Sequence, residues 1–212
     1  MVKFIIVRHG FSLGNKEKRF TGQLDLPLDE IGYSQAESVA KYILDNFKID
    51  VIYSSELCRA YDTALPLAKA LGKEVKKINA LNETDVGFWQ GKTFEEIKKE
   101  YPEGYALYVA SPGLCHFDGG ECYADVRARV VRGFHHIAEE NEGKTVFVAT
   151  HGGVIRNLLA AWLDISLERI TDVPRISNAS ITVAEYENGK ATLLGINCTK
   201  HLEDKVTEVA VI

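Results

Sequence analysis

Lys3-Phe4-Ile5-Ile6-Val7 runs directly into Arg8-His9-Gly10, and this stretch decides the fold. A short, largely β-branched run that is apolar on both faces is typical of a buried strand in a parallel sheet. The pattern returns at Thr145-Val146-Phe147-Val148-Ala149-Thr150, which passes into His151-Gly152-Gly153 and a helical segment over 154–163. Both stretches therefore predict a buried strand that leads into a histidine followed by glycine.

Strands and helices alternate along the rest of the chain, which favours an α/β layer architecture. Val51-Ile52-Tyr53 predicts a second buried strand, and we expect Ser55 to cap a helix over 56–71 that follows it. We therefore predict an α/β fold, a three-layer α/β/α sandwich around a mostly parallel sheet, with a C-terminal hairpin at or near the sheet edge. The remaining expected elements are a helix over 29–45, an edge strand at 75–78, a helix over 93–100 with a Thr93/Glu96 capping box that Tyr101-Pro102 ends, a helix over 123–140, and the hairpin of 181–186 and 191–196 around Asn188-Gly189.

The chain has 212 residues, of which 46% are hydrophobic and 26% charged, the balance of a soluble globular protein. This length suffices for one hydrophobic core, so we expect a single domain over 1–212 with a more irregular helical excursion around 84–122. Its 25 Lys and Arg against 30 Asp and Glu give a net charge of −5, which argues against a broad basic surface for nucleic acid or a membrane. A small local pocket for an anion stays compatible with this charge. No segment resembles a signal peptide or a membrane span, so we expect a cytoplasmic protein.

The four cysteines, Cys58, Cys115, Cys122 and Cys198, form no CxxC pair and no zinc-type spacing. Cys115 and Cys122 could approach each other, but we favour unpaired thiols for a cytosolic protein. The sequence contains no aspartate cluster and no His-x-x-x-His helix that would hold a catalytic cation. We therefore expect no metal and no other cofactor.

Polar residues of one chemical character follow three of the expected strands. Arg8-His9-Gly10 follows the first, Arg59 lies shortly after the second, and His151-Gly152 follows the late strand. Ligands of open parallel sheets bind beyond the carboxyl ends of the strands. Two arginines gathered there require an anion, and guanidinium groups match phosphate oxygens. The glycines allow close backbone approach, and the helix N-termini that follow favour negative charge. The pattern predicts a phosphate-type site.

Val7-Arg8-His9-Gly10, with Ser12 and Asn15, resembles the signature of the histidine phosphatase superfamily, also called the phosphoglycerate mutase-like family, in its short phosphatase-type branch. The resemblance extends in order over nearly the whole chain. Its further blocks are Ser54 to Ala64 around Arg59, Leu81 to Gly91 around Glu83, Gly119-Gly120-Glu121 followed by Arg127 and Arg129, and Thr150-His151-Gly152-Gly153.

The resemblance implies a role for each matched residue. His9 would attack phosphorus and form a phosphohistidine. Arg8, Arg59 and His151 would surround the equatorial phosphate oxygens and stabilise the charge that develops on them. Glu83 would protonate the leaving oxygen and then deprotonate the water that hydrolyses the phosphohistidine.

Further phosphate-binding residues are expected at Asn15 and, as weaker candidates, at Ser12, Gln23 and Gly152. Glu121 would order the rim of the pocket or orient an arginine. Trp89 is expected to pack in the core. Phe11 stands where the family commonly has Glu, Gln or Thr, and we expect it at the pocket mouth; His116 and Phe117 are candidate specificity residues. Arg127, Arg129 and Arg132 are expected on a solvated helix face, although one of them could reach the phosphate or the substrate tail.

The function predicted from these residues is a histidine acid phosphatase-type phosphomonoesterase. It would hydrolyse small phosphorylated metabolites, such as a sugar phosphate, a phosphoglycerate or a ribazole phosphate, and release inorganic phosphate. A phosphoglycerate mutase is the first alternative, but the 68 positions from Glu83 to His151 are fewer than such mutases carry. A non-catalytic phospholigand-binding protein is the second, and it would need neither His9 nor Glu83. A homodimer is one option for an oligomeric state that the sequence does not reveal.

Overall fold

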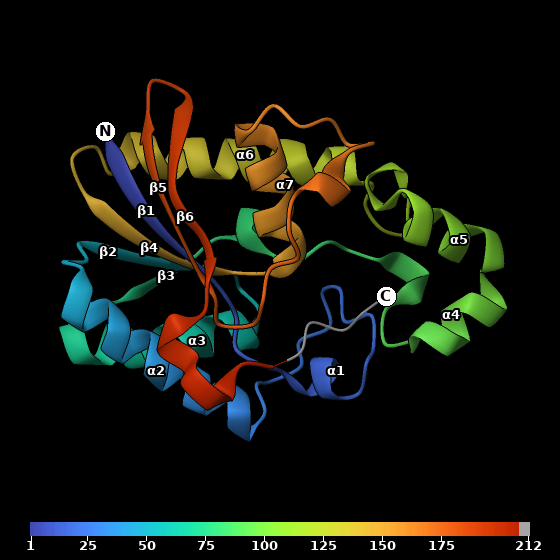
Figure 1. Cartoon of the computed structure of the whole chain (residues 1–212), viewed down its shortest axis with the longest axis horizontal. Helices are drawn as coiled ribbons and strands as arrows, with labels where there is room; N and C mark the ends of the chain where they lie inside the picture. The colour runs from blue at the N-terminus through green and yellow to red at the C-terminus, as the bar shows by residue number, and fades with distance from the viewer. Residues whose placement is uncertain (208–212) are drawn as a thin grey trace.

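Strand β4 (Thr145–Thr150) lies at the centre of a six-stranded sheet of order β3-β2-β4-β1-β5-β6, although it comes late in the chain. The computed structural model describes residues 1–207. β1 (Val2–Arg8), β2 (Val51–Ser54) and β3 (Val75–Lys77) run parallel to β4, and the hairpin of β5 (Ile181–Glu187) and β6 (Lys190–Cys198) adds to β1 in antiparallel fashion (Figure 1). The predicted mostly parallel sheet with an edge hairpin is confirmed.

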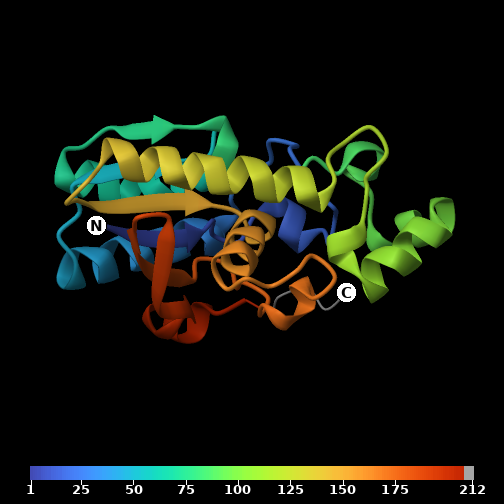
Figure 2. The same cartoon turned by 90° about the horizontal axis from the view of Figure 1, so that it is seen from above.

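Two pairs of helices cover the two faces of the sheet (Figures 1 and 2). Ile5 and Val7 of β1 pack toward α2 (Glu30–Asn46) and α3 (Cys58–Leu71), whereas Phe4 and Ile6 pack toward α6 (Tyr123–Glu140) and α7 (Gly152–Trp162). Because successive residues of a strand point to opposite faces, a strand that is apolar throughout contributes to two core layers. The predicted α/β/α sandwich is confirmed.

The excursion between β3 and α6 contains α4 (Phe94–Glu100) and α5 (Pro102–Ala110), which project beyond the end of the sheet (Figure 1). The predicted Thr93/Glu96 capping box is present. The sequence predicted no helix after Tyr101-Pro102, and this was incomplete, because proline suits the first position of a new helix. The shorter helical turns are α1 (Leu13–Lys16) and the 3-10 turns Asn79–Leu81, Gly87–Trp89, Pro112–Leu114, Ile170–Asp172 and Lys200–Lys205.

The expected cap at Ser55 is wrong. α3 begins at Cys58, and its N-cap residue Leu57 makes no side-chain cap. The Ser55 hydroxyl accepts the Leu57 N–H at 3.1 Å and lies 2.7 Å from Nε2 of His151. The Ser55 side chain therefore connects the segments that follow β2 and β4. Helix α3 starts later than the capping pattern indicated.

The four cysteines are free thiols. Within residues 1–207, no helix is long and apolar enough to cross a membrane. In the same part of the chain, no group of three or more His, Cys, Asp and Glu side chains is arranged to hold a metal ion.

Candidate active site

The carboxyl ends of β1, β2 and β4 lie level with one another. Arg8 pairs with Thr150 in the register of β1 and β4, and Ser54 pairs with Ala149 in that of β2 and β4. The residues that follow these strand ends meet at a cavity of about 490 Å³. The parallel register thus brings together segments that are far apart in the sequence.

The cavity contains the principal residues predicted from the sequence. Arg8, His9, Arg59 and Glu83 line it, and His151 is fully buried beside His9, with the two ring centroids 5.1 Å apart. Two arginines at one point concentrate positive charge, and among the described lining residues only the Glu83 carboxylate opposes it. Such a site favours an anion.

Hydrogen bonding assigns the protonated nitrogen of His9. Its Nδ1 lies 2.7 Å from the carbonyl oxygen of Gly10. A carbonyl only accepts, so Nδ1 carries the proton and Nε2 carries a lone pair when the ring is neutral. Burial, followed by the charges of Arg59 and Arg8, holds the pKa of His9 well below its usual value. His9 is therefore a neutral imidazole with a free lone pair at neutral pH.

His151 has a similar electrostatic environment. Burial is the main cause that lowers its pKa well below the usual value, and the Arg59 charge adds to it. Its Nε2 contacts the Ser55 hydroxyl at 2.7 Å, whereas Nδ1 has no hydrogen-bond partner among the described residues. One nitrogen is thus fixed by the protein and the other is left for a bound group.

Backbone carbonyls hold the two arginines. Arg8 Nη1 donates to Ile176 O, and Arg59 donates to Leu24 O at 2.8 Å and Gly22 O at 2.7 Å. The Nε of each arginine is buried without a partner in the described part of the chain. Burial lowers the pKa of Arg8 to about 10, so the group stays charged at neutral pH. Both cations are fixed in position without neutralisation, as anion binding requires.

The Glu83 carboxylate lies at the N-terminus of α7. Oε2 accepts the Gly153 N–H at 3.2 Å, and Oε1 accepts the Thr84 N–H at 2.9 Å. The side chain is partly buried and lines the same cavity as His9. These contacts fix the carboxyl group where it can exchange a proton with a ligand.

Asn15 is oriented by its neighbours. Its Oδ1 accepts from the Ser12 N–H at 3.1 Å, the Ser12 hydroxyl at 3.0 Å and Asn178 Nδ2 at 3.0 Å. With the oxygen occupied by three donors, the amide NH₂ is the group that remains for the cavity, which Asn15 lines. Asn178 also donates to the carbonyls of His9 and Gly10. No motif in the sequence indicated Asn178, which is 169 residues from His9.

The other predicted residues divide into two groups. Gly152, Phe11 and Phe117 line the cavity, whereas Ser12, Gln23 and His116 are not among its lining residues. Ser12 instead caps α1, Gln23 donates through Nε2 to the Glu83 carbonyl at 3.1 Å, and His116 is exposed. Trp89 is buried and packs edge-on against Phe20 and Phe117, as expected for a core residue.

The family model of the histidine phosphatase superfamily (branch 1) matches residues 4–199. The chain belongs to this family. It is a phosphatase of the histidine phosphatase type, as the resemblance of its motifs predicted.

One protein sequence and two solved structures show what this histidine phosphatase is similar to. Phosphoserine phosphatase 1 of Hydrogenobacter thermophilus is 36% identical over 98% of both chains. The structure of Bacillus stearothermophilus YhfR has a TM-score of 0.91 at 29% identity, covering 95% of this chain and 100% of that one. A mutant phosphoserine phosphatase from Entamoeba histolytica, solved in complex with phosphoserine, has a TM-score of 0.84 at 30% identity with the same coverage.

Away from the two histidines, one wall of the cavity of this histidine phosphatase combines aromatic side chains with a cation, and the motifs did not indicate it. Tyr108 from α5, Tyr123 at the start of α6 and Arg156 from α7 line it. Burial raises the pKa of Tyr108 to about 12, so its hydroxyl stays neutral. Arg156 donates through Nε to the Val173 carbonyl at 3.2 Å, and burial lowers its pKa. This wall offers aromatic surface and a cation to the part of a ligand that lies outside the phosphate region.

The expected solvated face of α6 is wrong for Arg129. Its side chain is 17% exposed and forms an ion pair with Glu121, with Nε and Oε1 2.6 Å apart. Helical periodicity alone could not indicate this contact, because Glu121 belongs to the loop that precedes the helix.

Proposed function

We propose that the chain hydrolyses small phosphomonoesters through a phosphohistidine formed on Nε2 of His9. The observation that carries the proposal is the neutral His9 ring, with Nδ1–H bound to the Gly10 carbonyl, between two charged arginines. In the first step, the Nε2 lone pair forms a bond to phosphorus and the bond from phosphorus to the leaving oxygen breaks. Glu83 gives its proton to that oxygen, so that an alcohol leaves rather than an alkoxide.

In the second step, a water molecule attacks the phosphorus of the phosphohistidine. Glu83, now a carboxylate, takes a proton from the water, and the bond from Nε2 to phosphorus breaks. Inorganic phosphate leaves, and both His9 and Glu83 return to their initial states. Hydrogen bonds from the Thr84 and Gly153 amides keep the carboxyl group in place through both steps.

Charge stabilisation is proposed for Arg8, Arg59 and His151. The unpaired Nε of each arginine and Nδ1 of His151 supply groups for the equatorial oxygens. The Asn15 amide adds a donor to the same phosphate. Because these groups are already fixed by carbonyls and by Ser55, no reorganisation is needed when charge develops on the phosphate.

We propose that the substrate carries a second anionic group, and that Arg156 binds it. A phosphorylated hydroxy acid or amino acid such as phosphoserine has a carboxylate that would extend along the wall of the cavity. The relatives named phosphoserine phosphatase support this substrate class. We propose one domain over residues 1–212. Its excursion around 84–122 contributes Tyr108 and Phe117 to the wall of the cavity.

The test measures release of inorganic phosphate from p-nitrophenyl phosphate and from phosphoserine. Wild-type protein should turn over both, His9→Ala should be inactive, and the exposed His136→Ala on α6 should match wild type. Trapping with phosphorus-labelled substrate should give an acid-labile adduct in wild type and none in His9→Ala.

Two outcomes would contradict the proposed hydrolysis, and each would indicate a different function. Tight binding of phosphoesters without turnover over a broad panel would indicate a phospholigand-binding protein. Conversion of 3-phosphoglycerate to 2-phosphoglycerate with 2,3-bisphosphoglycerate present, at a rate above that of phosphate release, would indicate a mutase.

A further inference from the structure

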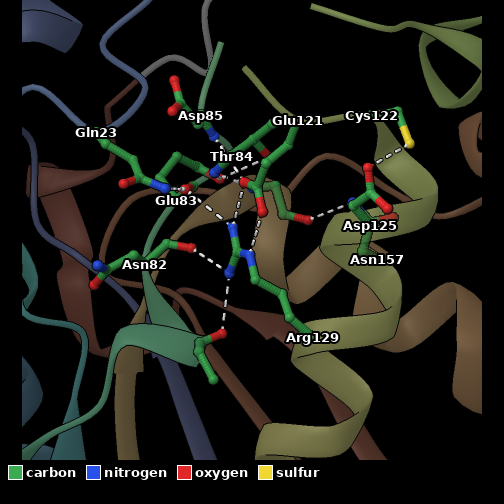
Figure 3. A network of polar contacts seen from close by, with 12 residues as sticks. Gln23, Asn82, Glu83, Thr84, Asp85, Glu121, Cys122, Asp125, Arg129 and Asn157 are labelled. Carbon is green, nitrogen blue, oxygen red and sulfur yellow. Dashed lines mark hydrogen bonds and ion pairs between the residues drawn. The ribbon is translucent and has the colours of Figure 1, made fainter. Parts of the chain in front are cut away.

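The Arg129 guanidinium binds backbone carbonyls of the segment that leads to Glu83 (Figure 3). Nη1 donates to the carbonyls of Ala80 at 3.0 Å and Asn82 at 2.8 Å, and Nη2 donates to the carbonyl of Glu83 at 3.1 Å. This segment begins within the 3-10 turn Asn79–Leu81 and belongs to no strand, so its carbonyls need partners from elsewhere. A side chain from α6 supplies them.

Glu121 holds both the arginine and the other side of Glu83. Its two oxygens accept from Arg129 Nε at 2.6 Å and Nη2 at 2.8 Å, a bidentate pair. Oε2 also accepts the Asp85 N–H at 2.9 Å, and the Glu121 N–H donates to the Asp85 carbonyl at 2.8 Å. The backbone is therefore tied on both sides of Glu83, at residues 82–83 and at Asp85.

The ion pair also makes the charge of Arg129 different in kind from those of Arg8 and Arg59, the two arginines proposed to bind phosphate. Arg8 and Arg59 are held by neutral carbonyls and form no ion pair within residues 1–207, whereas Arg129 is paired with a carboxylate. The pair is well shielded, with side-chain exposures of 17% and 22%. The position of the Arg129–Glu121 pair therefore suits fixing the backbone around Glu83 rather than binding phosphate.

We propose that Arg129 and Glu121 are positioning residues for proton transfer by Glu83. The inference rests on the proposed role of Glu83 as proton donor and extends it to two residues of another segment. The Glu83 carboxyl group can reach the leaving oxygen only while the 82–85 backbone keeps its place beside Gly153. A displacement of about 1 Å at a reacting group costs about 10²-fold in rate.

A misplaced proton donor has a specific signature. An alkyl phosphate has a poor leaving group that needs the proton, whereas nitrophenolate leaves without one. The ratio of kcat/KM for p-nitrophenyl phosphate to kcat/KM for phosphoserine therefore reports proton donation. kcat/KM covers the steps up to phosphohistidine formation, so slower hydrolysis of the intermediate does not affect this ratio.

The experiment measures that ratio for wild type, Glu83→Gln, Arg129→Met, Arg129→Lys and Glu121→Gln. Arg129→Met should lower kcat/KM for phosphoserine by about 10²-fold and for p-nitrophenyl phosphate by only about 3-fold, in the same direction as Glu83→Gln. Arg129→Lys should recover little, because a lysine cannot form the fork that holds three carbonyls and a carboxylate. Arg132→Met, at an exposed position on the same helix, is the matched control and should leave the ratio unchanged.

Glu121→Gln keeps the size of the side chain and decides the matter if Arg129→Met does not fold. Its NH₂ would face an arginine N–H, so the ratio should rise by about 10-fold if the pair positions Glu83. Equal losses on both substrates in the folded variants, while Glu83→Gln remains selective, would overturn the inference and leave the proposed function intact. Equal losses in Glu83→Gln would remove the proton donor itself, and the inference with it.

Discussion

Nε2 of His151 lies 2.7 Å from the hydroxyl oxygen of Ser55, a residue 96 positions earlier in the chain. Both side chains are fully buried, and the contact joins the segment after β2 to the segment after β4. Since the pKa of His151 is well below its usual value, the neutral ring has one proton to place on two nitrogens. The serine hydroxyl holds the ring orientation and thereby sets what Nδ1 can offer to a bound phosphate.

Ser55→Ala should therefore lower kcat for p-nitrophenyl phosphate by about 10-fold, because the His151 ring loses the contact that orients it. Ser54→Ala is the matched control, since Ser54 is equally buried but donates only to the Ser55 carbonyl. Steady-state kinetics with both variants test the prediction. Equal activities of the two would show that the orientation of His151 does not depend on Ser55.

Gly153→Ala should impair proton transfer without touching His9. An added Cβ at this position would lie 2.4 Å from Glu83 Oε1 and 3.0 Å from Thr84 Oγ1, so the carboxyl group has to move. We expect kcat/KM to fall by about 10²-fold for phosphoserine and much less for p-nitrophenyl phosphate. Gly195→Ala, whose Cβ would meet nothing within 4 Å, should behave as wild type. An active Gly153→Ala variant on both substrates would contradict the position assigned to Glu83.

Arg156→Met should discriminate between substrates by their charge. Loss of a charge-assisted hydrogen bond of about 1.5–3 kcal/mol should lower kcat/KM for phosphoserine by about 10- to 100-fold. Phosphoethanolamine, which lacks the carboxylate, serves as the internal control and should be hydrolysed as by wild type. Parallel losses on both compounds would indicate that Arg156 supports the cavity wall and binds no carboxylate.

Acid should destabilise the folded protein more than its exposed histidines explain. The pKa of His9 and that of His151 are both depressed, so below pH 6.5 the unfolded chain binds protons that the folded chain does not. Stability is then fully present above the unfolded pKa and falls as the pH drops, by about 1.4 kcal/mol per pH unit for each histidine. Thermal unfolding from pH 7.5 to 5 should show a weaker dependence for His9→Asn. The same slope in both proteins would mean that His9 is protonated in the fold.

The same shift governs activity. The proposed attack of His9 on phosphorus needs an unprotonated ring, so kcat/KM for p-nitrophenyl phosphate, measured as a function of pH, should persist well below pH 6.5.

The sequence predicted the parts of the site that follow strands, for a physical reason. Arg8, His9 and His151 come directly after apolar runs, and parallel pairing necessarily brings such ends to one edge of the sheet. Asn178 lies in an irregular segment, and Tyr108 and Arg129 lie on helices whose side chains contact irregular segments or the cavity. Helical or strand periodicity does not indicate such tertiary contacts. The start of α3 was misjudged because the Ser55 hydroxyl makes a tertiary contact with His151, and local capping rules do not include such contacts.

The order of the strands also has a consequence for biosynthesis. β1 and β2 are made early, but neither pairs with the other, because β4 separates them in the sheet. Until residues 145–150 have left the ribosome, the edge of β1 and the edge of β2 that pair with β4 have no partner. Nascent chains that pause or end before this point expose two unpaired edges, and such edges favour aggregation. The central strand thus makes the synthesis of this protein vulnerable to interruption over most of its length.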